Sequence, residues 1–305
     1  MKLSTFDIFK KLKPMGNNWV ALEGDTLLKY QRVLLHMASE IIEAFEKHGI
    51  CYQLSGGTAL GAVRHHGFIP WDEDIDLNVL SSDMDKIQEM LKNEFGNKYC
   101  FQDCHDPAYG NVTGKIRLRG SVSRSREDEG MSECGFAIDL FPIENLFDNK
   151  VLYLIHGVLC MALGFCLSCR KFYEKRTMYR RLEKQYPEIR KVFETKIILG
   201  RIFAIMSVQK WVILTNKCYR LCRDTHSKKV GIPSGRGHYF TETYLRRGMI
   251  NMEYIQFEDH YWKIATNYNE YLSKLFGPDY LQIPSKDKIE KHYLMELQFP
   301  DDIVL

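Results

Sequence analysis

The sequence predicts an α/β fold with a helical insertion and a C-terminal extension. Between residues 25 and 141, short apolar segments of strand length alternate with segments of helical periodicity, which is typical of compact α/β proteins. Residues 150–230 leave this pattern and are apolar and basic in turn, whereas 231–305 are rich in aromatic residues, Gly and Pro. We therefore divide the chain into a core with an N-terminal helix at 1–149, an insertion at 150–230 and an extension at 231–305.

The elements follow from local patterns. Residues 25–47 carry apolar side chains at helical spacing, and Gly49 ends this helix. Ser81 or Ser82 is a capping residue for a later helix that ends before Gly96. The other expected elements, in chain order, are a strand at 50–54, a helix at 58–66, strands at 75–80, 99–102, 111–118 and 136–141, strands or edge segments at 254–257 and 261–264, and a helix at 268–276.

Composition bounds the class of protein. The chain has 305 residues, 45% of them hydrophobic and 27% charged, which is typical of a globular protein. A net charge of +3 and the lack of a helix-turn-helix or zinc-finger pattern argue against nucleic acid as a partner. Met1–Asp7 lack the apolar region of a signal peptide, so we expect a cytoplasmic protein. The nine cysteines are then reduced thiols, with a structural zinc site as the alternative.

Residues 151–169 form an uncharged apolar segment of membrane-spanning length, with cations on both sides. Three interpretations stay open: a buried or interfacial helix of a soluble enzyme, a transmembrane span, and a membrane-embedded hairpin or docking helix. Basic and aromatic residues then alternate through 170–196, and 197–214 is apolar again. Such a stretch suits contact of residues 151–214 with an anionic membrane surface, and the alternative is a solvated helix face.

A glycine-rich turn precedes the second predicted helix, with the sequence Ser55-Gly56-Gly57-Thr58. Glycines let the backbone approach an anion closely, and the N-terminus of the following helix offers unpaired N–H groups to phosphate. Alone, such a turn is a weak signal. It gains weight because an acidic strand begins about fifteen residues later.

That strand begins with Asp72-Glu73-Asp74-Ile75-Asp76. Residues i and i+2 of a strand point to one face, so Asp74 and Asp76 converge, Asp72 lies on their side and Glu73 points away. Paired carboxylates are suitable ligands for Mg²⁺, with Mn²⁺ as an alternative. The competing interpretation is an acidic strand entrance exposed to water. Together the turn and the carboxylates indicate phosphoryl or nucleotidyl transfer.

Asp139 is the expected third carboxylate, because it is a single charge within an apolar strand. Its expected roles are metal ligation and activation of an incoming hydroxyl as general base, and the alternative is an ion pair with an Arg. Near the donor phosphates we place Arg64, Lys115 and Arg117, against ordinary salt-bridge roles. Weaker candidates for phosphate contact, or for metal binding and catalysis, are Arg124, Arg126, His65, His66, His238 and His292.

Residues 54–77, which include both motifs, closely resemble the signature of the LicD family, the bacterial phosphorylcholine transferases related to fukutin and fukutin-related protein. The resemblance continues at 138–142 and is weaker at 277–280 and 284–292. It implies a mixed-sheet nucleotidyltransferase core of the DNA polymerase β type. It also implies that Gly56, Gly57, Asp74, Asp76 and Asp139 match the positions that hold Mg²⁺ and nucleotide phosphates, and Thr58 belongs to the same turn.

The resemblance further implies transfer of a phosphorylated alcohol, typically phosphocholine, from a CDP-linked donor to a glycan hydroxyl. A teichoic acid, a capsule and a lipopolysaccharide precursor are all open as the acceptor. Two other functions compete with this one. The first is a true nucleotidyltransferase that moves NMP to a sugar, a small molecule or a protein. The second is a non-catalytic membrane-associated component of glycan assembly.

Overall fold

A mixed β-sheet forms the centre of the computed structural model, which describes residues 19–285, 289 and 291–301. Among these residues the sheet has seven strands, in the order β2-β3-β7-β5-β4, with β8 beside β7 and β9 beside β8. β3 and β7 are parallel, and the other pairs are antiparallel. The predicted α/β class with a mixed sheet is confirmed. The segment Met1–Asp7, on which the prediction about export depended, lies outside the described residues.

The strands of this sheet are β2 (Tyr52–Leu54), β3 (Asp76–Leu80), β4 (Tyr99–Gln102), β5 (Gly114–Leu118), β7 (Ala137–Leu146), β8 (Lys229–Gly231) and β9 (Thr243–Leu245). Smaller antiparallel pairs join β1 (Val20–Ala21) to β12 (Tyr293–Leu294), β6 (Val122–Arg124) to β13 (Glu296–Gln298), and β10 (Met252–Phe257) to β11 (His260–Ala265). The helices are α2 (Gly24–Lys47), α3 (Gly56–His65), α4 (Met84–Phe95), α5 (Lys150–Glu174), α6 (Arg176–Gln185), α7 (Arg190–Ile202), α8 (Val208–Tyr219), α9 (His238–Thr241), α10 (Arg246–Ile250) and α11 (Tyr268–Phe276), with short 3-10 turns η1 (Arg126–Asp128), η2 (Pro187–Ile189) and η3 (Phe203–Ile205).

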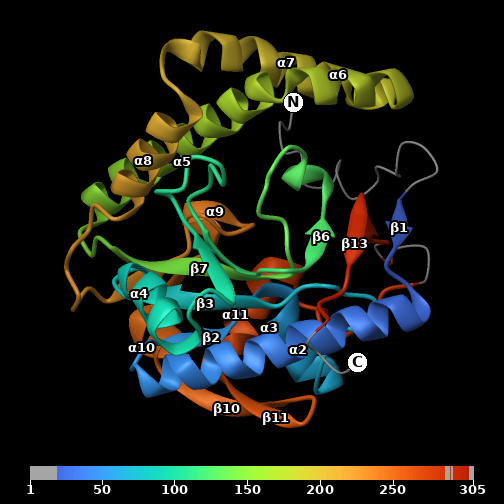
Figure 1. Ribbon diagram of the computed structural model, residues 1–305. Coiled ribbons are helices and arrows are strands. Elements are labelled where there is room, and N and C mark those ends of the chain that lie inside the picture. The colour runs from blue at the N-terminus through green and yellow to red at the C-terminus, as the bar shows by residue number, and fades with distance from the viewer. Residues whose placement is uncertain (1–18, 286–288, 290, 302–305) are drawn as a thin grey trace.

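Helix α2 covers one face of the sheet, as its periodicity predicts (Figure 1). Its apolar side chains enter the main core with those of β3 and β7, and those with no exposed surface are Val33, Leu34, Met37, Ala38, Ile41 and Phe45. Asp25 in its first turn and Lys47 in its last turn complement the helix dipole. Burial of this stripe, rather than intrinsic propensity, therefore fixes the helix on the sheet.

Some boundaries differ from the predicted ones for identifiable reasons. Asp83, rather than Ser81 or Ser82, is the N-cap residue of α4, because the Ser81 N–H donates to the Ile143 carbonyl at 3.1 Å and holds Ser81 at the end of the sheet. Strand β7 runs to Leu146 rather than stopping at 141. Pro142 is accommodated because the pairing of β7 with β5 ends at Leu140 and the pairing with β8 starts at Glu144.

Helices α5 to α8 follow β7 and gather on the side of the molecule away from α2 and the β10–β11 hairpin (Figure 1). They have small cores of their own. In one of these the rings of Phe172 and Tyr179 stack with centroids 4.1 Å apart, and Phe193 packs against both. Gly200 of α7 lies against the Cys169 carbonyl, so α5 and α7 approach each other closely.

Within the described residues, one helix is long and apolar enough to cross a membrane by length and composition, namely α5. Only 22% of its most apolar window is buried in the protein. Two consecutive helical segments, Pro187–Ile205 and Val208–Tyr219, pass the same test when taken together, but the chain bends by 88° between them. Of the three interpretations for 151–169, a helix buried within the enzyme fits this exposure poorly, whereas an interfacial, docking or spanning helix stays open.

The packing of α2 gives a first prediction. Met37→Ala removes a fully buried side chain, so we expect the free energy of unfolding to fall by about 2–5 kcal/mol. Leu28→Ala on the same helix is the control, because Leu28 is 55% exposed and should change stability by less than about 0.5 kcal/mol. Urea unfolding followed by circular dichroism measures both. Equal effects of the two substitutions would contradict the assigned helix face.

Candidate active site

The glycine-rich turn and the acidic loop are in direct contact. Gly56 has a φ of +49°, and a Cβ placed there would lie 2.8 Å from Asp76 Oδ2. A Cβ on Gly57 would lie 2.5 Å from Asp72 Oδ2 and 3.8 Å from Asp74 Oδ1. Gly56 is therefore favoured both by its backbone conformation and by the space that the Asp76 carboxylate occupies, whereas Gly57 is favoured by the space that Asp72 and Asp74 occupy.

Two hydroxyl groups hold this turn in place. Thr58 Oγ1 accepts a hydrogen bond from the Asp76 N–H at 2.8 Å, which ties the first turn of α3 to the start of β3. The Tyr271 hydroxyl of α11 accepts from the Gly56 N–H at 3.0 Å and lies 2.8 Å from Ser55 Oγ. No motif in the sequence marks Tyr271, which lies 215 residues from Gly56 along the chain.

The sheet brings the third carboxylate beside the first two. Asp76 and Asp139 are register partners across the parallel pair β3–β7, and the Asp139 N–H donates to the Ile75 carbonyl at 3.0 Å. On the other side of β7, Lys115 is the register partner of Asp139, and its Nζ lies 3.1 Å from Asp139 Oδ1. Asp139 is thus ion-paired as its alternative interpretation expected, but with a Lys and not with an Arg.

Several carboxylates lie close together in the site, where the protein largely excludes water. Burial, followed by the Asp72 and Asp76 carboxylates, raises the pKa of Asp74 well above its usual value. Burial and the neighbouring Asp139 likewise raise the pKa of Asp76. Burial is the largest single effect on Lys115 and lowers its pKa, but Asp139, Tyr109 and Asp128 together raise the pKa by more, so Lys115 stays charged. The carboxylates therefore exceed the nearby cations, which is the condition for binding a divalent cation through hard oxygen ligands.

Glu73 does not point away, so the expectation for this residue is wrong. Its carboxylate pairs with His292 Nδ1, and the ligand atoms of Asp72, Glu73 and His292 all lie within 4.8 Å of one another. The reason is that β3 begins only at Asp76, so the alternation of a strand does not extend back to residues 72–75. His292, one of the weaker candidates, thereby becomes part of the rim of the acidic loop.

The three basic candidates have different surroundings. Lys115 is at the carboxylates, as described. Arg64 donates from Nη1 to the carbonyls of Tyr280 and Gln282 at 3.1 and 3.2 Å. Burial lowers the pKa of Arg64, and the nearby Asp72 carboxylate opposes this shift. Arg117 is 2% exposed and is fully engaged, because it donates to Gln102, to the Gly135 carbonyl and to Asp128, the last at 2.5 Å. We therefore leave Arg117 out of the proposed donor site.

Comparison with known proteins agrees with the arrangement of these motifs. Residues 49–145 match the family described as the LicD/FKTN/FKRP nucleotidyltransferase domain. This segment contains the glycine-rich turn, the acidic loop and Asp139. Residues 49–145 are therefore similar to the domain of the LicD family, and the resemblance seen in the sequence is confirmed.

Individual relatives extend the likeness beyond this segment. The chain is 22% identical over 275 residues to the lipopolysaccharide cholinephosphotransferase LicD of Haemophilus influenzae, which covers 89% of this chain and 97% of the relative. It is 36% identical over 66 residues to the human ribitol 5-phosphate transferase FKRP, covering 22% of this chain and 13% of the relative. An uncharacterized protein of Rickettsia prowazekii is 33% identical over 79 residues, covering 24% of this chain and 30% of that protein.

Because the carboxylates repel one another, we expect the protein to become more stable when one of them is neutralised. Because the pKa of Asp74 is raised in the folded state, its ionisation opposes folding at neutral pH. Asp74→Asn should therefore raise the free energy of unfolding of the metal-free protein, by about 1.4 kcal/mol for each unit by which the pKa is raised. Urea unfolding in the presence of a chelator measures the gain.

The direction of the Asp74 pKa shift also determines how this gain in stability depends on pH. A raised pKa means that the native state binds the proton more tightly, so wild type regains the lost stability as pH falls through the folded pKa. The advantage of Asp74→Asn should be complete above that pKa and vanish near the ordinary value of 3.8. Glu253→Gln, at an exposed strand position, is the control and should show no such gain. A loss of stability in Asp74→Asn at neutral pH would contradict the assignment.

Proposed function

We propose that this protein transfers a phosphorylated alcohol, with phosphocholine as the first candidate, from a CDP-linked donor to a hydroxyl of a cell-surface glycan or a lipid-linked glycan precursor. The observation that carries the proposal is the contact between the glycine turn and the crowded carboxylates. It lies in a domain shared with a lipopolysaccharide cholinephosphotransferase and a ribitol 5-phosphate transferase. The mixed sheet that holds these groups is compatible with a nucleotidyltransferase core of the DNA polymerase β type.

The residues fit a divalent metal, which we propose is Mg²⁺, with Mn²⁺ as a substitute. Asp74, Asp76 and Asp139 would hold it, and Asp72 lies close enough to contribute. The fit rests on the closeness of these groups, because Asp72, Asp74 and Asp76 oxygens crowd around the glycine turn and Asp139 is the register partner of Asp76. Such a concentration of carboxylate oxygens suits a divalent cation. When bound, Mg²⁺ would neutralise the pyrophosphate of the donor and the charge that develops on the departing CMP.

The chain's own residues would bind the donor and move one proton. The backbone at Gly56 and Gly57 and the start of α3 would contact the donor phosphates, with Arg64 and Lys115 as the nearby cations. The acceptor oxygen forms a bond to the phosphorus that carries the alcohol, the bond from that phosphorus to the CMP oxygen breaks, and CMP keeps the electron pair. Asp139 would take the hydroxyl proton as general base, and Lys115 Nζ, 3.1 Å from Asp139 Oδ1, would hold its carboxylate in place.

Donor binding and product analysis test this proposal. CDP-choline, CDP-ethanolamine, CDP-ribitol, CDP-glycerol and CTP are titrated by calorimetry with and without Mg²⁺. We expect Mg²⁺-dependent binding of one CDP-alcohol, weakened at least about tenfold in Asp74→Asn, which equals about 1.4 kcal/mol. Because Asp74→Asn is expected to fold more stably than wild type, such a loss cannot come from unfolding. Glu253→Gln should bind like wild type.

The products separate this function from its alternatives. Release of CMP with a glycan acceptor supports phosphoalcohol transfer. Binding of CTP without any CDP-alcohol, with release of pyrophosphate, would instead favour a nucleotidyltransferase that moves NMP. If neither class of nucleotide bound at any Mg²⁺ concentration, with acceptor and vesicles present, the catalytic assignment would fail and a non-catalytic role in glycan assembly would be favoured.

We further propose that α5, α7 and η3 place the protein on the cytoplasmic face of an anionic membrane. Large apolar side chains of these elements face outward, among them Val151 at 65%, Ile202 at 62% and Ile205 at 83% exposure. Exposed cations lie among them, including Arg201 and Lys210. An apolar surface flanked by cations matches the layering of acyl chains and anionic headgroups. A lipid-linked acceptor would then be presented at the same surface.

Vesicle co-sedimentation tests the membrane proposal. The double variant Ile198→Asp/Ile202→Asp places two charges on the exposed face of α7, and we expect at least about a tenfold weaker binding to vesicles that contain anionic lipid. Binding by wild type should also fall with added salt. The matched control is Leu281→Asp/Ile283→Asp, two exposed apolar residues outside the insertion, which should bind as wild type does. Binding unaffected by the α7 variant would rule out this face.

A further inference from the structure

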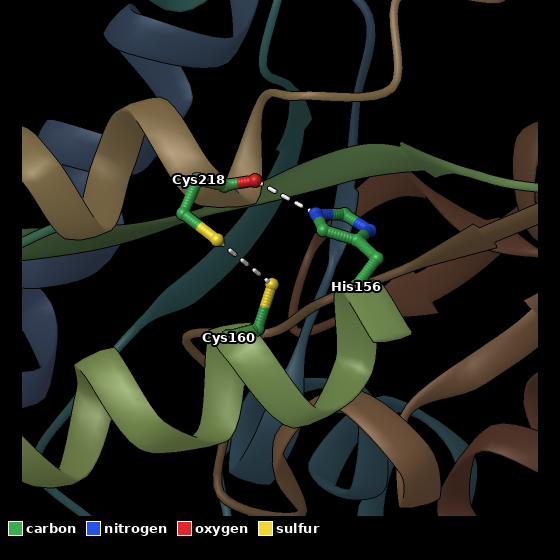
Figure 2. Close-up of side chains that lie close together, drawn as sticks. All are labelled: His156, Cys160 and Cys218. Carbon is green, nitrogen blue, oxygen red and sulfur yellow. Dashed lines mark hydrogen bonds between the residues drawn. The ribbon is translucent and has the colours of Figure 1, made fainter. Parts of the chain in front are cut away.

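Three metal-ligating side chains meet where the insertion joins the sheet, far along the chain from the acidic loop. His156 and Cys160 lie one helical turn apart on α5, so they share a face, and Cys218 approaches from the end of α8. Figure 2 shows the two sulfur atoms pointing toward each other and the imidazole beside them. The three ligand atoms all lie within 4.8 Å of one another, and the two Sγ atoms are 3.7 Å apart.

These separations suit tetrahedral coordination. With zinc–sulfur bonds of about 2.3 Å, two ligating sulfurs lie about 3.8 Å apart, and a sulfur and a nitrogen ligand about 3.6 Å apart. The sulfur pair already has this spacing. The ligand nitrogen of His156 lies within 4.8 Å of both sulfurs, so it needs to approach each of them by about 1.2 Å at most.

The imidazole is positioned by its surroundings. His156 is 2% exposed, and its ring contacts Phe147 and Tyr239 edge-on with centroids 5.2 Å away in each case. The nitrogen nearer the sulfurs, Nε2, donates to the Cys218 carbonyl at 2.7 Å (Figure 2). The other nitrogen, Nδ1, lies 3.1 Å from the Tyr239 hydroxyl. If Nε2 binds a metal, its proton moves to Nδ1 and the Tyr239 oxygen accepts it, which is the usual orienting contact of a ligating histidine.

The two thiols would lose their protons on binding a metal. Metal binding requires thiolates. Cys160 is almost fully buried, whereas Cys218 is partly exposed, so a metal here would be enclosed on the side of α5 and reachable by a water ligand on the side of Cys218.

We propose that His156, Cys160 and Cys218 bind one Zn²⁺ ion in a structural site that fastens α8 to α5 beside α9. Two thiolates and one imidazole are a donor set that zinc prefers to Mg²⁺, which takes oxygen ligands. The fourth position is left to water. Among the described residues, two other groups have ligand atoms this close together, and both are weaker candidates for a new metal site. Asp103, Cys104 and His105 are consecutive in one turn, and Asp72, Glu73 and His292 belong to the candidate active site. The zinc site does not depend on the proposed transferase function.

Cobalt and zinc binding by the full chain tests the site. Protein purified with a non-thiol reductant and stripped of metal is titrated with Co²⁺. We expect one equivalent with a thiolate-to-cobalt charge-transfer band, displacement of that band by Zn²⁺, and a rise of Tm with Zn²⁺. Cys160→Ser and Cys218→Ser should lose the band and weaken Zn²⁺ binding at least about 100-fold. Cys166→Ser, a partly exposed thiol of the same helix, is the matched control and should keep both.

Several results would overturn the proposal. If a serine variant does not fold, the wild-type titration still tests the proposal. Absence of the charge-transfer band in reduced wild-type protein would reject the site. Zinc binding that survives both serine variants would place the metal elsewhere, and Asp74→Asn, which should retain the band, tells whether that place is the acidic loop. A mass lower by two hydrogens, with no metal bound after reduction, would show a Cys160–Cys218 disulfide instead.

Discussion

The parallel pairing of β3 with β7 is the constraint on which the candidate site depends. It sets Asp76 beside Asp139, residues 63 positions apart in sequence, and no local feature of either strand could do this. The acidic loop that leads into β3 then lies against the glycine turn, where a side chain on Gly56 or Gly57 would collide with a carboxylate. The sheet register, the missing Cβ atoms and the carboxylates therefore form one arrangement, and a change in any of them displaces the others.

Keeping several carboxylates close together costs stability, and the structure offsets part of that cost with contacts from distant segments. Lys115 from β5 pairs with Asp139, and His292 pairs with Glu73 at the rim. The turn is braced by Tyr271 of α11, within the C-terminal extension. Although the family domain covers residues 49–145, the site is thus completed by residues well beyond it. This agrees with the likeness to the Haemophilus influenzae relative along nearly its whole length.

The sequence predicted what is local and missed what is distant. Spacing within a few dozen residues predicted the bounds of α2 and α11. It also predicted that the glycine turn and the acidic loop belong to one site. Alternation correctly put Lys115 and Arg117 on one strand, but it could not show that Asp128 and Gln102 enclose the Arg117 guanidinium. The expectation for Glu73 failed because a strand pattern was extended beyond the first residue of β3. Tyr271 and His292 are brought to the site by tertiary contacts alone.

Helix α5 shows why hydropathy could not choose among the interpretations of residues 151–169. It is apolar around its whole circumference, and a helix of that kind needs cover on every side. The structure assigns the inner face to Cys160, Leu167 and Phe172, which pack on neighbouring helices, and leaves Val151, Leu154 and Val158 outward. Water on that outer face would be unfavourable by roughly 25 cal/mol for each Å² of apolar surface. Since α7 and η3 expose apolar side chains as well, the apolar surface extends over several helices, and the proposed membrane contact would cover it as a whole.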